Sequence, residues 1–409
     1  MNIKETVKNI LRPIIRPIIT KIRCKEQLKY KDKFLMDLKD IIYKDNYDAI
    51  IIFDTYFGFN MKMFQRPQHM ALNLSNENIL YFYKASPYVD KEIEICKKIK
   101  TNLYIINTDI YWVQEGLLDI IKESNIKAFA QIYSTSFIEY DKYVKKFLDR
   151  GLKIIYEFVD ELSDDIAGFK LTEEIKRSHK YMLEDIENIY VITTANELYE
   201  EVKSIRGEKR LALIENGVEF EHFFEIKSNG IPEKMKEIIG EKKIIGYLGA
   251  LAKWFDYELI KRVSSEFRNM NVVLIGVNYD NSIIKSGILN LDNIYYIEAI
   301  DYKFLPDYAR FFDISIIPFI INDVTKSTSP VKLFEYMALG KPIVTTNLPE
   351  CRKYKSPLIS KNHNEFIENI KKAIELEKDC DYKFQLTKEG HENTWTQRAI
   401  DMKNFILNS

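Results

Sequence analysis

The segment Thr325–Thr345, TKSTSPVKLFEYMALGKPIVT, gathers hydroxyl, lysine and glutamate side chains around one predicted helix. The run Ser-Thr-Ser before Pro330 consists of residue types that begin helices, and Gly340 is typical of a helix end. The free N–H groups and positive dipole end of such a helix favour a bound anion such as a diphosphate. Thr328 and Ser329 would add hydroxyl donors to this anion site.

Two charged side chains lie inside the same predicted helix. Glu335 follows the helix start by about a turn and a half, where its carboxylate can accept two hydrogen bonds from the vicinal hydroxyls of a ribose. Lys332 would add positive charge beside the anion, or would be a solvated lysine on the helix surface. An ordinary amphipathic helix with a serine cap and no ligand explains the same residues. The residues alone therefore leave both interpretations open.

A second segment, Ile244–Asp256 with the sequence IIGYLGALAKWFD, predicts a strand that runs into a turn of small residues. Gly246 and Gly249 allow the backbone to approach a ligand closely, and Lys253 follows at a distance suited to a phosphate. The segment lacks both the G-x-G-x-x-G and the G-x-x-x-x-G-K-[ST] spacing. Neither a dinucleotide-dependent dehydrogenase nor a P-loop NTPase is therefore supported.

The first half of the chain offers charged residues where predicted strands end. Asp54 and Asp160 stand at or just after such ends, and Arg66 precedes a proline in a predicted loop that leads to a helix. Either carboxylate of the pair Asp160 and Glu161 could orient an acceptor hydroxyl or act as a base. Each of these residues could equally belong to a charged surface loop. His69 is expected on a helix surface.

The composition is that of a globular chain with a formal net charge of only −1. The chain has 409 residues, 46% of them hydrophobic, and 60 Lys and Arg balance 61 Asp and Glu. This length favours two domains, and the charge balance gives no sign of nucleic-acid binding. The four cysteines are isolated, so neither a disulfide framework nor a zinc site is indicated, and a reducing compartment fits. No segment reads as a signal peptide or a membrane span, so we expect a cytoplasmic protein.

The amino terminus departs from this balance. Residues 1–34 hold ten Lys and Arg against three acids, and apolar residues recur at helical spacing between positions 10 and 19. This pattern indicates either a basic amphipathic segment on an anionic membrane or a solvated arm packed on the first domain. Pro13 and Pro17 would break or kink a helix there. Peripheral attachment to the inner face of the cell membrane is therefore one of two expectations.

The elements that position all these residues follow an alternating pattern. Short β-branched and aromatic runs alternate with longer segments of helical periodicity, which predicts parallel sheets covered on both faces. Seven strands are expected in the first half (48–54, 78–83, 103–106, 127–133, 152–158, 189–194 and 211–214) and five in the second (243–248, 271–276, 293–297, 314–317 and 342–346). The predicted fold class is α/β, with two Rossmann-like, doubly wound domains facing a cleft. The predicted division is a basic N-terminal arm or helix (1–46), a first domain (47–225), a linker (226–242), a second domain (243–389) and a final helix (390–409) that crosses back to the first domain.

Several segments together resemble a known family. The run S-P-V-K-L-F-E-Y-M-A-L-G-K-P-I-V looks like the signature of the group 1 (family 4) glycosyltransferases of the GT-B fold. Further segments fall in the order expected for that family, namely G-Y-L-G-A-L-A-K-W-F-D at 246–256, N-V-V-L-I-G at 271–276, Y-A-R-F-F-D-I-S-I-I-P-F at 308–319 and I-E-N-G-V-E-F-E-H-F at 214–223. Q-R-P-Q-H-M-A at 65–71 resembles a segment of members that build cell-surface, teichuronic-acid-like polysaccharides. The similarity covers roughly residues 48–405.

The resemblance implies a donor site in the second domain. Gly249 and Lys253 would approach the diphosphate of the donor, Glu335 would hold its ribose, and the backbone around Ile300 would contact its base. The diphosphate itself would lie in a cradle of backbone donors from Thr328, Ser329, Pro330 and Val331. Two positions depart from the family pattern. Ser327 replaces the first glutamate of a glutamate pair, and Ala250 replaces an arginine that often follows the loop glycine, which puts the contacts to the donor sugar in doubt.

The resemblance also implies an activity. The enzyme would transfer a hexose or related sugar from a nucleoside-diphosphate sugar of the UDP type to a hydroxyl of a glycan or lipid-linked acceptor. The transfer would proceed with retention and without a metal or other cofactor. Lys253 and Lys332 would stabilise the leaving group, Asp160 would act on the acceptor, and Asp54 and Arg66 would lie on the acceptor side. The process would be the synthesis of a surface polysaccharide or glycoconjugate. Two alternatives remain: a non-catalytic nucleotide-sugar or glycan-binding member that acts as a membrane-associated assembly partner, and a sugar-nucleotide epimerase of the same fold.

Overall fold

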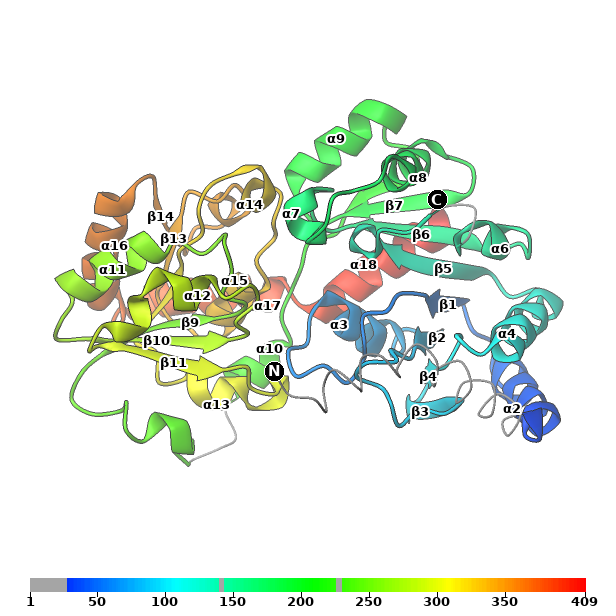
Figure 1. Cartoon of the computed structure of the whole chain (residues 1–409), viewed down its shortest axis with the longest axis horizontal. Coiled ribbons are helices and arrows are strands. Elements are labelled where there is room, and N and C mark those ends of the chain that lie inside the picture. The colour runs from blue at the N-terminus through cyan, green and yellow to red at the C-terminus, as the bar shows by residue number, and fades with distance from the viewer. Residues whose placement is uncertain (1–27, 140–142, 226–229) are drawn as a thin grey trace, which may run out of the picture.

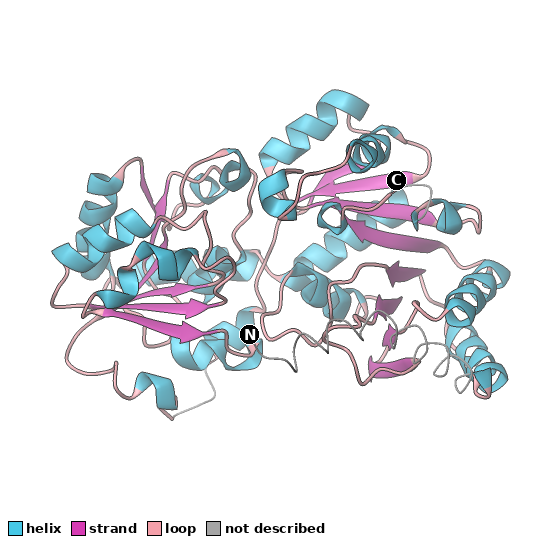
Figure 2. Cartoon of the chain, viewed as in Figure 1, coloured by secondary structure: helices cyan, strands magenta, loops and turns pink. Residues whose placement is uncertain are grey.

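The computed structural model describes residues 28–139, 143–225 and 230–409. These residues form two lobes, each built on one sheet with helices on both of its faces (Figures 1 and 2). The first lobe holds an eight-stranded sheet and the second lobe a six-stranded sheet. The predicted fold class, α/β with two doubly wound domains, is confirmed.

The first sheet has the strand order β3-β4-β2-β1-β5-β6-β7-β8. Its strands are β1 (Ala49–Phe53), β2 (Ile79–Lys84), β3 (Cys96–Lys100), β4 (Leu103–Ile106), β5 (Ala128–Tyr133), β6 (Lys153–Phe158), β7 (Ile189–Thr193) and β8 (Leu211–Leu213). β3 pairs with β4 in antiparallel orientation, and the other described pairs of this sheet are parallel. Alternation along β1 sends Ile50 and Ile52 into one apolar cluster and Ile51 and Phe53 into the other, as expected for a strand buried on both faces.

Helices cover both faces of this sheet. Residues of α2 (Lys31–Tyr43), α4 (Tyr111–Ser124), α6 (Lys145–Leu148), α8 (Glu173–Glu184) and α9 (Asn196–Arg206) pack in the first cluster. Residues of α3 (Arg66–Leu74) and of the C-terminal α18 (Trp395–Asn408) pack in the second. The short helix α7 (Asp164–Ala167) follows β6, whereas α10 (Phe220–Phe224) packs with Phe220 and Phe223 in the apolar cluster of the second lobe.

The second sheet has the strand order β11-β10-β9-β12-β13-β14, and its described pairs are all parallel. The strands are β9 (Ile244–Leu248), β10 (Asn271–Gly276), β11 (Ile294–Glu298), β12 (Ile314–Ile317), β13 (Ile343–Thr346) and β14 (Leu358–Ser360). The helices are α11 (Tyr257–Glu266), α12 (Ser282–Ser286), α13 (Leu305–Ala309), α14 (Asp323–Lys326), α15 (Val331–Ala338), α16 (His363–Leu376) and α17 (Cys380–Glu392). A single large apolar cluster joins this sheet to its helices.

The C-terminal segment returns to the first lobe, where α18 lies beside α3 (Figure 1). Trp395, Met402 and Ile406 of α18 are fully buried in the second cluster of the first lobe. The sequence predicted this final helix over 390–409, and in the structure it begins later. α17 ends at Glu392, and α18 begins after Thr394, whose hydroxyl accepts the N–H of Gln397 at 3.2 Å as a helix cap.

The sequence analysis did not predict two of the strands, β3 and β14. β3 has the sequence CKKIK, and its lysines suit the edge of a sheet, where charged side chains discourage pairing with another chain. β14 has only three residues and lies at the edge of the second sheet. Neither strand shows the apolar run by which a buried strand is recognised.

Each sheet has a point at which the winding of the chain reverses. In the first sheet the reversal falls between β1 and β5, and in the second it falls between β9 and β12. Open α/β sheets bind their ligands beyond the carboxyl ends of the strands at such points. The loops that follow these four strands are therefore the places to look for a site.

The basic N-terminal arm lies mostly outside the described residues, which begin at residue 28, so its contact with a membrane stays a prediction. None of the helices in the described part of the chain has the length and apolarity needed to cross a bilayer.

Candidate active site

The reversal point of the second sheet holds a lysine packed against a glycine. Gly249 directly follows β9 and has φ +138°, a conformation that residues with a side chain rarely adopt. A Cβ built on Gly249 would lie 2.7 Å from Cε and 3.2 Å from Nζ of Lys332, so only glycine leaves room for this lysine. The Lys332 ammonium lies 4.7 Å from the ring centroid of Phe319, beyond β12, and 5.4 Å from that of Tyr247 on β9.

Lys332 has no salt bridge in the part of the chain that the structure describes. Burial is the main reason why the pKa of its ammonium falls to about 8. Glu335, three residues further along α15, is 6% exposed, and burial raises the pKa of its carboxyl to about 7. Lys332 and Glu335 thus lie near each other on one helix, and both have pKa values near 7 to 8. They stand beyond the carboxyl ends of the strands, where a parallel sheet binds its ligand.

The start of α15 differs from the prediction. Pro330 occupies the N-cap position, and no side chain caps the helix. The Thr328 hydroxyl donates to the Val324 carbonyl at 2.9 Å, which ties it to the end of α14 instead of leaving it for a ligand. Ser329 Oγ accepts the N–H of Asn216 at 3.4 Å and keeps its own hydrogen for another acceptor. The backbone donors at the start of α15 remain the basis for an anion site.

Other predicted residues of this domain take different places. Lys253 is exposed, and its backbone N–H donates to Asp280 Oδ2 at 3.0 Å. Gly246 was expected to approach a ligand, and this was wrong, since a Cβ there would lie 2.1 Å from the ring of Phe312 inside the core. Ile300 lies half-buried after β11, packed on the apolar cluster. The lysine held at the reversal point is therefore Lys332.

The reversal point of the first sheet also opens into a pocket. The pocket lies between the loops after β1 and β5 and has a volume of about 590 Å³. Asp54 forms part of its wall and is 4% exposed. Lys146 Nζ lies 3.0 Å from Asp54 Oδ2, and Lys84 Nζ lies 3.3 Å from Asp54 Oδ1. Asp54 is thus paired with two lysines at the carboxyl end of β1.

Asp160 and Glu161 follow β6, the next strand in the sheet. Burial raises the pKa of the Asp160 carboxyl to about 7, so that it can exchange a proton near neutrality. Burial also raises the pKa of Glu161, and the negative charge of Asp323 on α14 adds to this. The pair therefore lies on the side of the first domain that meets the second.

Arg66 is not a surface residue, and the structure places it between the domains. It begins α3, is 4% exposed, and its Nε donates to Glu157 Oε2 at 2.5 Å. Its Nη1 donates to the Glu215 carbonyl at 2.9 Å and to Asn216 Oδ1 at 3.4 Å. Its Nη2 has no hydrogen-bond partner among the described residues. Asn216 Nδ2 in turn donates to the Ser329 carbonyl at 2.7 Å.

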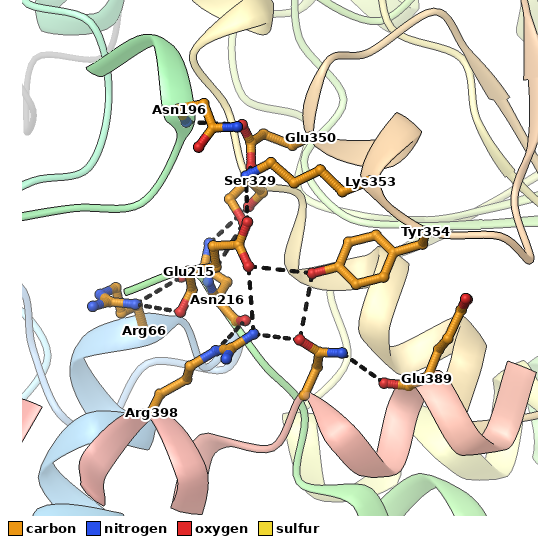
Figure 3. A network of polar contacts seen from close by, with 11 residues as sticks. Arg66, Asn196, Glu215, Asn216, Ser329, Glu350, Lys353, Tyr354, Glu389 and Arg398 are labelled. Carbon is orange, nitrogen blue, oxygen red and sulfur yellow. Dashed lines mark hydrogen bonds and ion pairs between the residues drawn. The ribbon is translucent and has the colours of Figure 1, made fainter. Parts of the chain in front are cut away.

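Figure 3 shows that this chain of bonds belongs to a larger network around Glu215 and Asn216. The Glu215 carboxylate contacts Lys353, and the Tyr354 hydroxyl donates to it at 3.3 Å. Arg398 Nε, from α18, donates to the Asn216 carbonyl at 3.1 Å. One short loop of the first domain therefore fixes the start of α15 and gathers groups from both domains.

An aromatic group lies beside this network. His69 was expected on a helix surface, and this was wrong. Its side chain is fully buried and stacks on Trp395 with ring centroids 4.9 Å apart. It also meets the ring of Tyr302, from the second domain, at 4.8 Å, and its Nδ1 lies 3.2 Å from Glu219 Oε1. Burial lowers the pKa of its imidazole.

The sequence missed Asn216, Glu157 and Glu219 as functional positions. Their partners lie 113, 91 and 150 residues away in the chain, so no local pattern marks the contacts. The described residues include no group of three or more His, Cys, Asp or Glu side chains that could hold a metal ion.

Known proteins agree with this architecture. HepE from Anabaena, solved in complex with UDP and glucose, has a TM-score of 0.64 at 10% identity, with 89% of this chain and 100% of that chain covered. Sucrose-phosphate synthase from Thermosynechococcus elongatus has a TM-score of 0.63 at 12% identity, with 88% and 98% covered. Two facing Rossmann-like domains of this kind define the GT-B fold.

The sequence comparisons find a similarity to one enzyme family. Residues 242–376 match the model described as glycosyl transferases group 1. The putative teichuronic acid biosynthesis glycosyltransferase TuaH of Bacillus subtilis (strain 168) is 28% identical over 214 residues, which are 51% of this chain and 53% of that protein. The alignment thus spans about half the length of this curated relative. Residues 242–376 are thus similar to the group 1 glycosyltransferases, and the chain as a whole has the fold of the GT-B glycosyltransferases.

Proposed function

We propose that the protein transfers a sugar from a nucleoside-diphosphate sugar to a hydroxyl of an acceptor glycan or lipid-linked glycan. One observation carries this proposal. Lys332, a cation without a salt bridge in the described chain, lies against Gly249 at the reversal point of the second sheet, and Glu335 stands one turn further along the same helix. The ammonium and the start of α15 suit a diphosphate, and the carboxylate suits a ribose.

The donor is proposed to be of the UDP type. The structure of HepE contains UDP and glucose, which gives this choice of base its support. The base would lie along the backbone near Ile300, and Lys332 with the Ser329 hydroxyl would contact the diphosphate. Lys253, exposed at the end of the Gly249 loop, would act only at the rim.

The reaction breaks the bond between the anomeric carbon and the diphosphate oxygen and forms a bond from that carbon to the acceptor oxygen. Negative charge develops on the leaving diphosphate, and Lys332 with the dipole of α15 would stabilise it. The acceptor hydroxyl loses its proton, and Asp160, whose pKa of about 7 suits a base near neutrality, is the proposed recipient in the first domain. The stereochemical outcome proposed from the family resemblance is retention, and no metal ion is assigned a role.

The acceptor side is proposed to be the first domain. The pocket at Asp54 lies at the reversal point of that sheet, and the relative TuaH carries a name from teichuronic acid biosynthesis. We therefore propose a role in the synthesis of a surface polysaccharide, in the cytoplasm, with residues 1–34 as a contact to the anionic membrane. Arg66 would act there by positioning the domains, because its charge is bound to Glu157.

A non-catalytic, nucleotide-binding member remains the second candidate because Ser327 donates its hydroxyl to the Asp323 carbonyl at 3.2 Å instead of presenting a carboxylate to the sugar. Turnover of a sugar nucleotide separates this candidate from an enzyme.

The donor site is tested by thermal unfolding of the full chain with UDP, GDP, ADP, dTDP and CMP. A ligand that binds only the folded state at 100 times its Kd stabilises the protein by about 2.7 kcal/mol. We expect one diphosphate to raise the Tm, and Glu335→Ala to abolish the rise. Glu368→Ala, an exposed glutamate on α16, is the matched control and should keep it. No rise with any nucleotide would contradict the proposed donor site.

A further inference from the structure

The second sheet opens between β9 and β12, and a backbone N–H of β9 faces the opening. β10 pairs with β9 as far as Leu248, whereas β12 pairs with β9 only through Ile245 and Gly246. The N–H of Gly249 donates to the Ile275 carbonyl of β10 at 2.9 Å, so the N–H of Leu248, one residue earlier, faces the side of β12. Since the ladder with β12 has ended by then, this N–H needs a partner outside the sheet.

A tyrosine of α15 is this partner. The Tyr336 hydroxyl accepts the N–H of Leu248 at 2.7 Å, and the Tyr336 side chain is fully buried. Burial raises the pKa of the phenol above its ordinary value, so the group stays protonated at neutral pH. Leaving a buried N–H without an acceptor is destabilising. Tyr336 therefore fastens α15 to the last residue of β9.

Tyr336 stands beside the two residues proposed to bind the donor. It directly follows Glu335 and lies one turn after Lys332 on α15, and its hydrogen bond reaches the residue just before Gly249. This bond thus sets where α15 lies along β9, and with it where Lys332 lies against Gly249. Lys332 makes no salt bridge among the described residues, so its position depends on this packing and on the two aromatic rings that it contacts.

A second buried tyrosine holds the other end of the Gly249 loop. Tyr247, on β9, donates its hydroxyl to the Ala250 carbonyl at 2.8 Å. A Cβ built on Gly249 would lie 3.0 Å from this hydroxyl, and the Lys332 ammonium lies 5.4 Å from the centroid of the Tyr247 ring. The backbone from Leu248 to Ala250 is therefore held by one phenol at each end, with Gly249 between them.

The loop that follows β10 packs on the same backbone. A Cβ built on Gly276 would lie 1.8 Å from the Gly249 carbonyl oxygen, so only glycine allows the two backbones to come so close. The Tyr296 hydroxyl donates to the Gly276 carbonyl at 3.0 Å and holds this second loop in place. The Gly249 loop is thus fixed both by hydrogen bonds and by close packing.

We propose that Tyr336 and Tyr247 are positioning residues for the donor diphosphate. Tyr336 sets the register of α15 on β9, Tyr247 fixes the loop that Lys332 packs against, and Lys332 therefore meets the diphosphate from a fixed place. Both phenols are fully buried, so they act through Lys332 and the loop. The proposal rests on the proposed function and names the residues that preorganise its donor site, because a binding group is effective only when its supports hold it in the productive geometry.

The test is a double-mutant cycle in which calorimetric titration measures the affinity of the full chain for UDP. Tyr336→Phe keeps the ring, removes the acceptor of the Leu248 N–H, and should weaken UDP about 10-fold. In Lys332→Met, which lacks the cation, the same substitution should weaken UDP less than about 2-fold, because Tyr336 acts through Lys332. An equal loss in both backgrounds, or an unchanged Kd in Tyr336→Phe alone, would overturn the proposal for Tyr336.

Tyr247→Phe tests the second phenol, and a third tyrosine is the matched control. Tyr247→Phe should weaken UDP roughly 3- to 10-fold, and an unchanged Kd would overturn its assignment. Tyr382 donates its hydroxyl to the Ser356 carbonyl at 2.7 Å, just before β14 and thus at the amino ends of the strands, away from the site. Tyr382→Phe should lower the Tm about as much as Tyr336→Phe and leave the Kd for UDP unchanged. A control that weakened UDP equally would tie the effect to stability alone and contradict positioning.

A measurement without nucleotide separates this inference from the donor proposal. Heteronuclear NMR of the Lys332 ammonium follows its pKa in the parent protein and in Tyr336→Phe. We expect the pKa to rise from about 8 toward 10.5 in the variant, because α15 is no longer fastened to β9 and the ammonium meets more water. If the pKa rises while no nucleotide raises the Tm of the parent protein, the positioning role holds and the donor site fails. If UDP raises the Tm while Tyr336→Phe changes neither this pKa nor the Kd, the donor site stands and the positioning role is wrong.

Discussion

Lys332 should stabilise a bound diphosphate at a cost to the empty protein. Burial lowers the pKa of its ammonium from 10.5 to about 8. At about 1.4 kcal/mol for each pKa unit, the charged form is disfavoured by at most about 3 kcal/mol. Because part of the side chain is exposed, we take about 2 kcal/mol. Lys332→Met, which keeps the side-chain length and removes the charge, should therefore stabilise the unliganded protein by about 2 kcal/mol at pH 7.

The sign of the pH dependence follows from linkage. Since the pKa of Lys332 is lower in the folded state than in the unfolded state, the folded state binds fewer protons between pH 8 and 10.5. The cost of the charge is complete below pH 8 and disappears as the pH rises toward 10.5. At pH 9.5 the difference in unfolding free energy between Lys332→Met and the parent protein should be less than half its value at pH 7.

The assay combines urea unfolding at the two pH values with calorimetric titration of UDP. Loss of a charge-assisted hydrogen bond of about 1.5–3 kcal/mol should weaken UDP about 10- to 100-fold in Lys332→Met. Lys326→Met is the control, because Lys326 is 43% exposed and pairs with Asp323 on α14, so both quantities should change little. A Lys332→Met protein that is less stable than the parent, or that binds UDP equally well, would refute the reasoning.

The remaining predictions concern the fixing of α15 and the protonation of the site. Asn216→Asp replaces the N–H that bonds the Ser329 carbonyl with a carboxylate oxygen, so the affinity for UDP should fall about 10-fold by calorimetry, and an unchanged Kd would show that this bond does not position α15. The UDP affinity of the parent protein should be highest between about pH 7 and 8, because Glu335 loses its negative charge below its pKa of about 7 and Lys332 loses its positive charge above its pKa of about 8. The raised pKa of Glu335 also means that its contribution to stability declines as the pH rises from 4.5 through 7. An affinity that does not vary between pH 6 and 9 would count against both assignments.

The central strands could be predicted because they are buried on both faces. The run Ile50–Ile52 and the run Val272–Ile275 are continuous apolar stretches, and each lies within a strand of the structure. β3 could not be predicted in this way, since an edge strand with the sequence CKKIK carries the polar pattern of a loop.

Those parts of the candidate site that depend on neighbouring residues in the sequence could be predicted. The helix that carries Lys332 and Glu335 could be predicted from its apolar periodicity and from Gly340 at its end. The hydrogen-bond partners of the hydroxyl groups just before this helix could not. Thr328 finds an acceptor in α14, and Ser329 accepts from Asn216, 113 residues away in the sequence.

The burial of Arg66 and His69 between the domains could not be predicted either, because it depends on partners far away in the sequence. Arg66 donates a hydrogen bond to Glu157, and His69 stacks on Trp395, and only the folded chain brings these partners together. Sequence reasoning could name a charged residue and a histidine at these places, but their burial depends on contacts between the domains.

The account is tested most directly by turnover of a sugar nucleotide. Release of the nucleoside diphosphate should be measured for the full chain with UDP-glucose and other UDP-sugars, with methyl glycosides of common hexoses as trial acceptors. We expect release that depends on the glycoside and falls at least 10-fold in both Lys332→Met and Glu335→Ala. Tight nucleotide binding without release from any sugar donor, in the presence of every acceptor, would contradict a glycosyltransferase and favour the non-catalytic, nucleotide-binding protein.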